Sequence, residues 1–403
     1  MKLLKVLSVS ELKEHLIDYL RSKQSIIELD LINSLDYVLA EDVYALEDIP
    51  NFYKSTVDGY ALKAKDTQLA SESIPSILKC RESVKIGSIN TIELGERECS
   101  YINTGAMLPY NSNAVLMIED SDYVEATNEV LVFKSLAENE NVSIPGVDIT
   151  QDMLLFKQYQ LIDSRVLATL ASQGIKKVKV FKKMSCAIIS SGNELVPYQS
   201  EIMQAQVRDI NTILLDKTLI KYGFEIKQTK LIKDDFDLYY QSLKEIDVDI
   251  YLTSGGSSQG NEDYTYDVFD KLTSNVFCHG LAIKPGKPTV VARNDNKLYL
   301  GLPGNPVSAY LVLRQTLIEA YLELYHIKKT IILAHLAHNT NSSPGKDSLI
   351  LVKFVFEDNK VIAKPLYYRS SNVYVLAQAD GYFVITSNSE GKNKDDIVEV
   401  IVF

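Results

Sequence analysis

Hydrophobic residues recur with helical spacing near the start of the chain. The apolar positions of this stripe are Leu12, Leu16, Ile17 and Leu20. Ser8 and Glu11 precede them with the three-residue spacing of a capping box, in which two side chains satisfy backbone N–H groups of the first helical turn. The pattern predicts an amphipathic helix that packs on a later domain. A second helix is expected over 164–172, closed by Gly174.

The segment 185–325 alternates apolar runs that suit strands with runs that suit helices. Its order is strand, helix, strand, helix, strand, helix, two short strands and helix, which is typical of a doubly wound α/β domain. In open parallel sheets, ligands bind beyond the carboxyl ends of the strands. The loops at 190–194, 254–263 and 301–306 each follow a strand, so we expect them to converge on one crevice.

Short alternating runs dominate two other parts of the chain. Residues 50–148 contain few convincing helical stretches and predict a β-rich insertion, which follows an extended connector over 26–46. The tail over 327–403 alternates strand-like runs with turn residues and predicts a small antiparallel β-barrel. The expected fold class is a multi-domain α/β protein with a doubly wound domain, a β-rich insertion domain and a C-terminal β-barrel.

A length of 403 residues suits two to four domains. The expected division assigns 1–25 plus 179–326 to the doubly wound domain, 26–47 plus 149–178 to a connector domain, 48–148 to the insertion and 327–403 to the barrel.

Composition narrows the class of protein. The chain is 46% hydrophobic and 24% charged, and no run of eighteen apolar residues occurs, so we expect a soluble cytoplasmic protein without a membrane partner. The net charge of −11 argues against a nucleic-acid partner, which would require clustered lysine and arginine. Four scattered cysteines lack the CxxC spacing of zinc or redox sites and are expected to be buried thiols.

The run GLPGNPVSAYL at 301–311 combines a buried strand end, a tight loop and an immediate helix start. Asn305 is a favourable N-cap, Pro306 suits the first helical turn, and Ser308 adds a hydroxyl. The free N–H groups and the positive end of the helix dipole favour an anion at such a junction.

Two earlier loops add candidate donors. Lys284 and Lys287 flank a Pro-Gly turn, where the alternative is a solvated lysine turn. After a strand that ends near Thr253, a glycine loop offers backbone N–H groups and hydroxyls, although a polar surface loop is also possible. This loop comprises Ser254, Gly255, Gly256, Ser257 and Ser258. It lacks the spacing of a P-loop, and no dinucleotide fingerprint follows a strand.

These loops occur with four further motifs: STVDGYAL at 55–62, INTGAMLP at 102–109, AVLMIED at 114–120 and SSGNEL at 190–195. In this order and with these spacings, the chain resembles the molybdopterin molybdotransferase family, known as MoeA in bacteria and similar to the E domain of gephyrin. The resemblance covers nearly the whole chain. It implies that the doubly wound domain binds molybdopterin.

The resemblance implies insertion of molybdate into adenylylated molybdopterin with release of AMP, assisted by Mg²⁺. Molybdopterin adenylyltransferase and molybdoenzymes become possible partners. It also implies a homodimer in which the insertion of one subunit approaches the α/β domain of the other, so that the active site is shared.

Residues that match the family motifs carry expected roles. Asp58, Glu194 and Asp263 are candidate metal ligands, because Mg²⁺ takes oxygen ligands. Together with Thr104, Lys284 and Lys287 they form the expected catalytic set. The expected substrate-binding set comprises Asp148, Ser254, Gly255, Gly256, Ser258, Pro303, Asn305, Pro306 and Ser308.

Each acidic candidate has a structural alternative. Asp58 can form a turn before Gly59, Glu194 can be a charge at a helix start, and Asp263 can be an N-cap. Asp209 and Asn211 resemble a D-x-N segment of the family, with capping of the following helix as the alternative. His335 and His338 are interpreted as incidental and not as a metal site.

The chain departs from the family pattern where arginines are expected. Residues 143–148 read SIPGVD, whereas the family has arginines before Gly-Glu-Asp. In the barrel, Lys346, Ser370 and Ser371 are the possible replacements for an arginine-bearing strand and a Ser-Ser pair. Lysine does not reproduce the bidentate contacts of arginine.

Two other functions are alternatives to the molybdotransferase. A molybdopterin adenylyltransferase resembles only 180–325 and lacks the insertion and the barrel. A non-catalytic molybdenum-cofactor carrier or gephyrin-like scaffold is supported by the missing arginines, and it predicts ligand binding without AMP release.

Overall fold

The computed structural model describes residues 5–255, 264–369 and 371–403. The chain forms two compact units, each of which contains segments distant in sequence. The first unit comprises 1–41, 159–167 and 177–403, and the second comprises 42–158 and 168–176. The predicted division into four domains stays a prediction.

The first unit contains a six-stranded sheet in the order β16-β13-β17-β21-β20-β18. Its strands are β13 (Ser185–Ser191), β16 (Glu225–Ile232), β17 (Ile250–Ser254), β18 (Val276–His279), β20 (Val290–Arg293) and β21 (Leu298–Leu302). The first four in spatial order are parallel, and β20 and β18 continue the sheet in antiparallel pairing. The predicted doubly wound domain is confirmed, with an antiparallel edge added.

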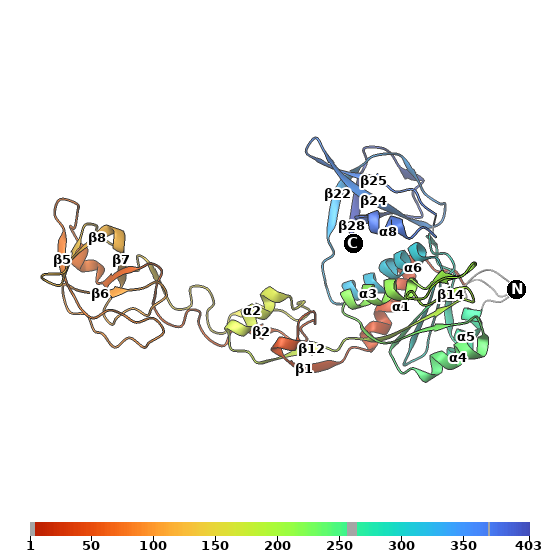
Figure 1. The fold of residues 1–403 in the computed structure, drawn as a ribbon, viewed down its shortest axis with the longest axis horizontal. Coiled ribbons are helices and arrows are strands. Elements are labelled where there is room, and N and C mark those ends of the chain that lie inside the picture. Colours follow the sequence, from red (N-terminus) through yellow and green to blue (C-terminus); the bar gives the residue numbers. More distant parts are fainter. Residues whose placement is uncertain (1–4, 256–263, 370) are drawn as a thin grey trace. The chain divides into compact units, whose positions relative to one another are not determined.

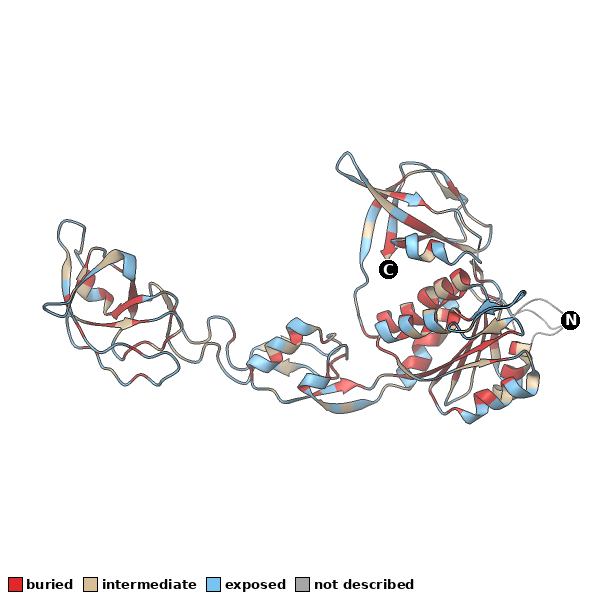
Figure 2. Cartoon of the chain, viewed as in Figure 1, coloured by how far each residue is buried: buried red, intermediate tan, exposed pale blue. Residues whose placement is uncertain are grey.

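Helices cover both faces of this sheet (Figure 1). One face packs against α1 (Val9–Ser22), α3 (Asn211–Lys221), α6 (Pro306–Leu313) and α7 (Glu319–Leu324), with a π-helical turn, Arg314–Ile318, between the last two. The other face packs against α4 (Phe236–Glu245) and α5 (Tyr264–Thr273). Along β13, Cys186 and Ile188 enter the first core, whereas Ala187 and Ile189 enter the second. Because side chains alternate across a strand, an apolar run buried on both faces becomes a central strand. Many residues in the strands of this sheet are buried (Figure 2).

The first predicted helix is confirmed as α1, including its capping box. The backbone N–H of Glu11 donates to Ser8 Oγ over 3.2 Å, and the backbone N–H of Ser8 donates to Glu11 Oε2 over 2.8 Å. The predicted apolar stripe is buried and packs largely against α7. The second predicted helix is α2 (Ser164–Ser172), and Gly174 after it has a φ of +70°.

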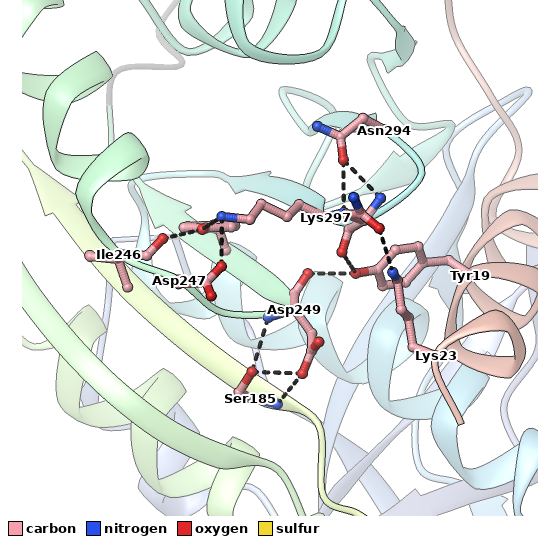
Figure 3. A network of polar contacts seen from close by, with 10 residues as sticks. Tyr19, Lys23, Ser185, Ile246, Asp247, Asp249, Asn294 and Lys297 are labelled. Carbon is pink, nitrogen blue, oxygen red and sulfur yellow. Dashed lines mark hydrogen bonds and ion pairs between the residues drawn. The ribbon is translucent and has the colours of Figure 1, made fainter. Parts of the chain in front are cut away.

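Polar side chains form a dense network at the amino ends of the central strands (Figure 3). Tyr19 of α1 donates its hydroxyl to the Asp249 carbonyl over 2.6 Å. The Asp249 carboxylate accepts the backbone N–H of Ser185 over 2.8 Å and the Ser185 hydroxyl over 2.6 Å. Lys297 donates to the Tyr251 hydroxyl over 2.8 Å. This network ties α1 and the starts of three strands together.

The remainder of the first unit contains shorter pairs of strands. β1 (Ile26–Asp30) pairs antiparallel with β12 (Lys177–Phe181), and Leu31–Asn33 forms a 3₁₀ turn after β1. β14 (Leu195–Val196) pairs in parallel with β15 (Val207–Arg208).

The C-terminal part of the first unit is a closed barrel. Its strands are β22 (Ile331–Leu336), β24 (Asp347–Glu357), β25 (Lys360–Pro365), β26 (Gly381–Ile385) and β28 (Ile397–Val402). They pair in the order β24-β25-β22-β28-β26, and a further pairing of β26 with β24 closes the circle. β19 (Ile283–Lys284), β23 (Thr340–Asn341), β27 (Gly391–Lys392) and α8 (Tyr374–Gln378) accompany it. The predicted barrel is confirmed, but it is not wholly antiparallel, because β22 and β25 pair in parallel.

The second unit is built on a six-stranded sheet in the order β7-β4-β6-β5-β9-β8. These strands are β4 (Gly59–Leu62), β5 (Ser76–Cys80), β6 (Glu98–Ile102), β7 (Ala114–Met117), β8 (Ser121–Val124) and β9 (Glu129–Val132). Two short pairs, β2 (Val43–Tyr44) with β11 (Leu154–Phe156) and β3 (Lys54–Ser55) with β10 (Val142–Ser143), and two 3₁₀ turns, Ala64–Thr67 and Ile118–Asp120, complete it. The predicted β-rich insertion is confirmed.

All four cysteines are buried thiols, as expected. Two of them, Cys80 of β5 and Cys99 of β6, lie opposite each other on paired strands. Within the described residues, none of the helices has the length and apolar character needed to cross a bilayer.

Candidate functional site

A cavity of about 880 Å³ lies in the first unit, beyond the carboxyl ends of the central parallel strands. Three loops that follow β13, β17 and β21 contribute to its lining, together with the start of α3. The lining residues from these four segments are Ser191, Gly192, Asn193, Glu194, Asp209, Asn211, Ser254, Gly255, Pro303, Gly304, Asn305 and Pro306. The predicted convergence of these loops on one crevice therefore holds for their described residues.

Close backbone packing explains the first glycine of the glycine loop. Gly255 has a φ of +101°, and a Cβ atom there would lie 2.1 Å from the Ser191 carbonyl oxygen. Only glycine combines this conformation with this approach. The loop after β17 is thereby held against the end of β13.

Asn211 joins two of the loops. Its side chain is 9% exposed, and Nδ2 donates to Ser254 Oγ over 2.6 Å and to the Gly304 carbonyl over 2.7 Å. The capping alternative applies instead to Asp209, whose carboxylate accepts the backbone N–H of Thr212 over 3.1 Å. Asp209 thus stabilises the start of α3, while Asn211 holds the glycine loop and the loop before α6 together.

Several buried polar atoms around the cavity lack a hydrogen-bond partner in the part of the chain that the structure describes. Within the described residues, Ser191 Oγ, Asn211 Oδ1 and Asp234 Oδ1 are buried without a hydrogen bond. Buried polar atoms are normally paired, because an unpaired one costs about 1–3 kcal/mol. Three such atoms around one cavity indicate a place where polar ligand groups complete the bonding.

Two further carboxylates, besides that of Asp209, line the cavity. Glu194 is exposed in a turn that leads into β14, so the alternative that it begins a helix is wrong. The Asp234 carboxylate accepts the backbone N–H of Asn193, and Asn193 Oδ1 accepts that of Asp234, both over 3.3 Å. Sequence reasoning missed Asp234, although it follows the end of β16 and the carboxyl-end rule points to that position.

The loop before α6 has the predicted geometry with one difference. Asn305 occupies the N-cap position and Pro306 the first helical turn, but the Asn305 side chain makes no capping hydrogen bond. Its side chain thus leaves the first N–H groups of the helix uncapped, as an anion site requires. Ser308 is buried within α6 and does not contribute to the cavity lining.

The two lysines lie beside the cavity rather than in its lining. Both are exposed, and Lys284 belongs to β19, where it is opposite Ser348 of the barrel strand β24. Pro288, the residue after Lys287, does line the cavity. The turn between the lysines is fixed by Gly286, where a Cβ atom would lie 2.2 Å from Val312 Cγ2.

Asp58 and Thr104 meet in the second unit. Asp58 Oδ1 accepts the backbone N–H of Thr104 over 2.7 Å, and this bond lowers the pKa of the Asp58 carboxyl. The motif needs its glycine, because a Cβ atom on Gly59 would lie 1.8 Å from the Leu116 carbonyl oxygen. Asp148 is exposed, and its backbone N–H donates to the Ile49 carbonyl over 3.1 Å.

The structure places the other candidates variously. Gly256, Ser257, Ser258, Asp263 and Ser370 lie outside the described residues. Ser371 lines the cavity and Lys346 does not. His335 is part of strand β22, and the interpretation of the two histidines as incidental stays a prediction.

Comparison with known families accounts for most of the chain. Residues 7–174 match the model of the MoeA N-terminal region, domains I and II. Residues 187–323 match a probable molybdopterin binding domain, and residues 334–403 match the MoeA C-terminal region, domain IV.

Whole-chain relatives agree with these matches. A molybdopterin molybdenumtransferase from Staphylococcus aureus strain MSSA476 is 34% identical over 292 residues, which cover 72% of this chain and 69% of that protein. One from Staphylococcus epidermidis strain ATCC 35984 is 28% identical over 382 residues, or 93% and 91% of the two chains. The crystal structure of a molybdopterin biosynthesis MoeA protein from Pyrococcus horikosii aligns over 99% of both chains with a TM-score of 0.80 and 33% identity. The resemblance inferred from the motifs is confirmed, and the chain belongs to the MoeA family of molybdopterin molybdenumtransferases.

Proposed function

We propose that this protein transfers molybdate into adenylylated molybdopterin and releases AMP, as the last step in making a molybdenum cofactor. The observation that carries the proposal is the cavity at the carboxyl ends of β13, β17 and β21, where three buried polar atoms lack partners among the described residues. In a chain of this family, a phosphorylated pterin supplies the polar groups that such atoms require.

The residues of the cavity fit a magnesium ion. Mg²⁺ is usually held by one or two carboxylates together with waters and substrate phosphates. Glu194 and Asp234 would hold it here, and the described residues contain no group of three or more acidic, histidine or cysteine ligands. Asp58 and Asp263 remain the candidates from sequence. When bound, the ion neutralises charge on the phosphate oxygens and so favours loss of AMP.

The remaining residues position the substrate. The uncapped N–H groups at the start of α6 face an anionic group favourably, and Asn211 fixes the distance between this loop and the glycine loop. Lys284 and Lys287 add two exposed cations on the loop that ends at Pro288. A phosphate that enters the cavity is thereby drawn by charge and oriented by backbone donors.

The test is AMP release from adenylylated molybdopterin by the purified protein, with and without Mg²⁺ and molybdate. We expect release that requires both, and loss of release in Asp234→Asn. Asp237→Asn, an exposed carboxylate on α4, is the matched control and should retain full activity. Tight binding of the adenylate without AMP release would overturn the proposal in favour of a carrier or scaffold.

A homodimer with a shared active site belongs to the same proposal, in the cytoplasm with the adenylyltransferase and molybdoenzymes as partners. Asp58→Asn and Asp234→Asn lie in different units, so a mixture of the two inactive variants tests the sharing. If each site takes one residue from each subunit, random mixing restores about a quarter of the sites. Sites built within one subunit would show no recovery.

A further inference from the structure

A second cavity of about 250 Å³ in the first unit shares no lining residue with the site cavity. It lies where the end of α3, the π-helical turn and α7 meet the segment that leads into the barrel and the end of the last strand. Its principal lining residues are Lys221, Tyr222, Arg314, Tyr321, Lys328 and Phe403. None of the functional motifs includes these positions.

Arg314 is the unusual member of this cavity. Its side chain is 3% exposed, and burial lowers the pKa of the guanidinium from its ordinary value. Nη2 donates to the Val402 carbonyl over 3.3 Å. The guanidinium lies 4.8 Å from the ring centre of Tyr222 and 5.6 Å from that of Phe403. The Tyr382 hydroxyl also hydrogen-bonds to the guanidinium, so its recorded partners are neutral groups and aromatic rings, with the Glu319 carboxylate acting on it from nearby.

No anion in the described chain neutralises this charge. Within the described residues, Arg314 makes no ion pair shorter than 4.0 Å with any carboxylate, the chain end included, and its Nε has no acceptor. The nearby carboxylate of Glu319 is paired with Lys329 over 2.7 Å. A buried charge without a paired partner is strongly unfavourable, so the site gains most from a ligand that supplies one.

The rest of the lining reinforces this charge. Lys221 and Lys328 are exposed at the cavity and, among the described residues, neither forms an ion pair. The lining contains one acidic side chain, Asp36, and four cationic ones, those of Lys221, Arg314, Lys328 and Lys329. The potential in the cavity is therefore positive, and the low-dielectric walls strengthen it.

Size and wall chemistry narrow the ligand further. Tyr222, Tyr321 and Phe403 contribute ring surface, which an inorganic anion does not use. A volume of about 250 Å³ is below the usual range for drug-sized ligands, about 300–1,000 Å³. We propose that this cavity binds a small monocarboxylate with an aromatic or branched apolar body, whose carboxylate pairs with Arg314.

Such a ligand would contact both parts of the first unit. The cavity includes Ile327 and Thr330, which lead from α7 into β22 of the barrel, as well as Val402 at the end of β28. A bound carboxylate therefore links the barrel to the α/β core and stabilises the folded chain by mass action.

Benzoate is a suitable probe, with benzamide as its neutral analogue and inorganic phosphate as an anion without an apolar body. Titration calorimetry and ligand-observed NMR on the full-length protein should show benzoate binding with a Kd of about millimolar, and no binding of the other two. The Arg314→Met variant keeps the side-chain volume and should weaken benzoate binding at least about tenfold, because a charge-assisted pair is lost.

Arg293→Met is the matched control. Arg293 also lies near an aromatic ring, Phe277 at 5.9 Å, and donates to a backbone carbonyl, but it lies outside the cavity. It should leave benzoate binding unchanged. If Arg314→Met does not fold, the exposed double variant Lys221→Met with Lys328→Met should weaken binding about threefold. Equal binding by these variants and the parent, no benzoate binding by the parent, or binding of phosphate in its place would overturn the proposal.

Discussion

Polar groups at the two ends of the central strands in the first unit differ in how completely they are hydrogen-bonded. At the amino ends of the strands, Tyr19, Ser185 and Asp249 form mutual hydrogen bonds of 2.6–3.0 Å. At the carboxyl ends, Ser191 Oγ and Asp234 Oδ1 are buried without partners in the described chain. Strand β13 thus begins in a completed network at Ser185 and ends in an incomplete one at Ser191.

This difference separates residues that stabilise the fold from residues that await a ligand. A completed network contributes to the free energy of unfolding and leaves no group for another molecule. An incomplete network lowers stability and supplies binding energy when a ligand arrives. Substitutions at the amino edge should therefore change stability alone, whereas those at the carboxyl edge should change AMP release.

Gly255→Ala should have the largest effect. The new Cβ atom would lie 2.1 Å from the Ser191 carbonyl oxygen at a φ of +101°, so the end of β17 or β13 must move. We expect a loss of about 2–4 kcal/mol in the free energy of unfolding and AMP release reduced at least about 100-fold. Urea denaturation and the AMP assay measure the two effects. Gly345→Ala is the control, because its added Cβ atom meets no neighbour at a similarly positive φ of +68°.

Asn211→Leu should have a smaller effect on stability and still reduce activity. The substitution removes the donors to Ser254 Oγ and to the Gly304 carbonyl, which we expect to cost about 1–3 kcal/mol. AMP release should fall at least about tenfold, because the two loops lose their common anchor. Asn211→Asp keeps the size but not the donors and should fail in the same way. Full activity of either variant would contradict the anchoring role.

Tyr19→Phe tests the completed hydrogen-bond network at the amino ends of the strands. Tyr19 is 2% exposed, and burial raises the pKa of its hydroxyl far above the usual value. A raised pKa means that its stabilisation is full below about pH 10 and is lost as pH rises further, by about 1.4 kcal/mol per unit. The variant should lose about 1 kcal/mol at pH 7 and show a shallower fall in melting temperature between about pH 10 and 11.5. AMP release at pH 7 should be unchanged. Parallel pH profiles would show that Tyr19 already ionises freely.

Glu194→Gln should have the smallest effect on stability. Glu194 is exposed, so we expect a change within about 0.5 kcal/mol in the free energy of unfolding. AMP release should nevertheless fall at least about tenfold, with a higher Mg²⁺ requirement, because a candidate oxygen ligand is lost. Glu201→Gln, exposed in the following segment, is the matched control. An unchanged Mg²⁺ requirement in Glu194→Gln would remove Glu194 from the metal site.

Particular residues show how far the sequence could lead. The capping box at Ser8 and Glu11, and the turn to α6 at Asn305 and Pro306, were predictable because they depend on neighbours within four residues. The convergence of the loops was also predictable, since parallel strands in one sheet present their carboxyl ends at one edge. Asp234 was not predicted because it belongs to no local motif. Its position after the carboxyl end of β16 nevertheless agrees with the rule that ligands bind beyond the carboxyl ends of parallel strands.

The sequence by itself determined the family, the fold class and the order of the elements, because hydrophobic period, turn residues and motif spacing are local properties of the chain. Only the tertiary structure decided that Asn211 binds two other loops, that the lysines lie beside the cavity, and that Arg314 is buried without an ion pair in the described part of the chain. Those outcomes depend on contacts between residues about 40–90 positions apart or more. Such contacts arise from packing. The surroundings of a side chain are therefore fixed only when the helices and strands that contain the contacting residues have packed together.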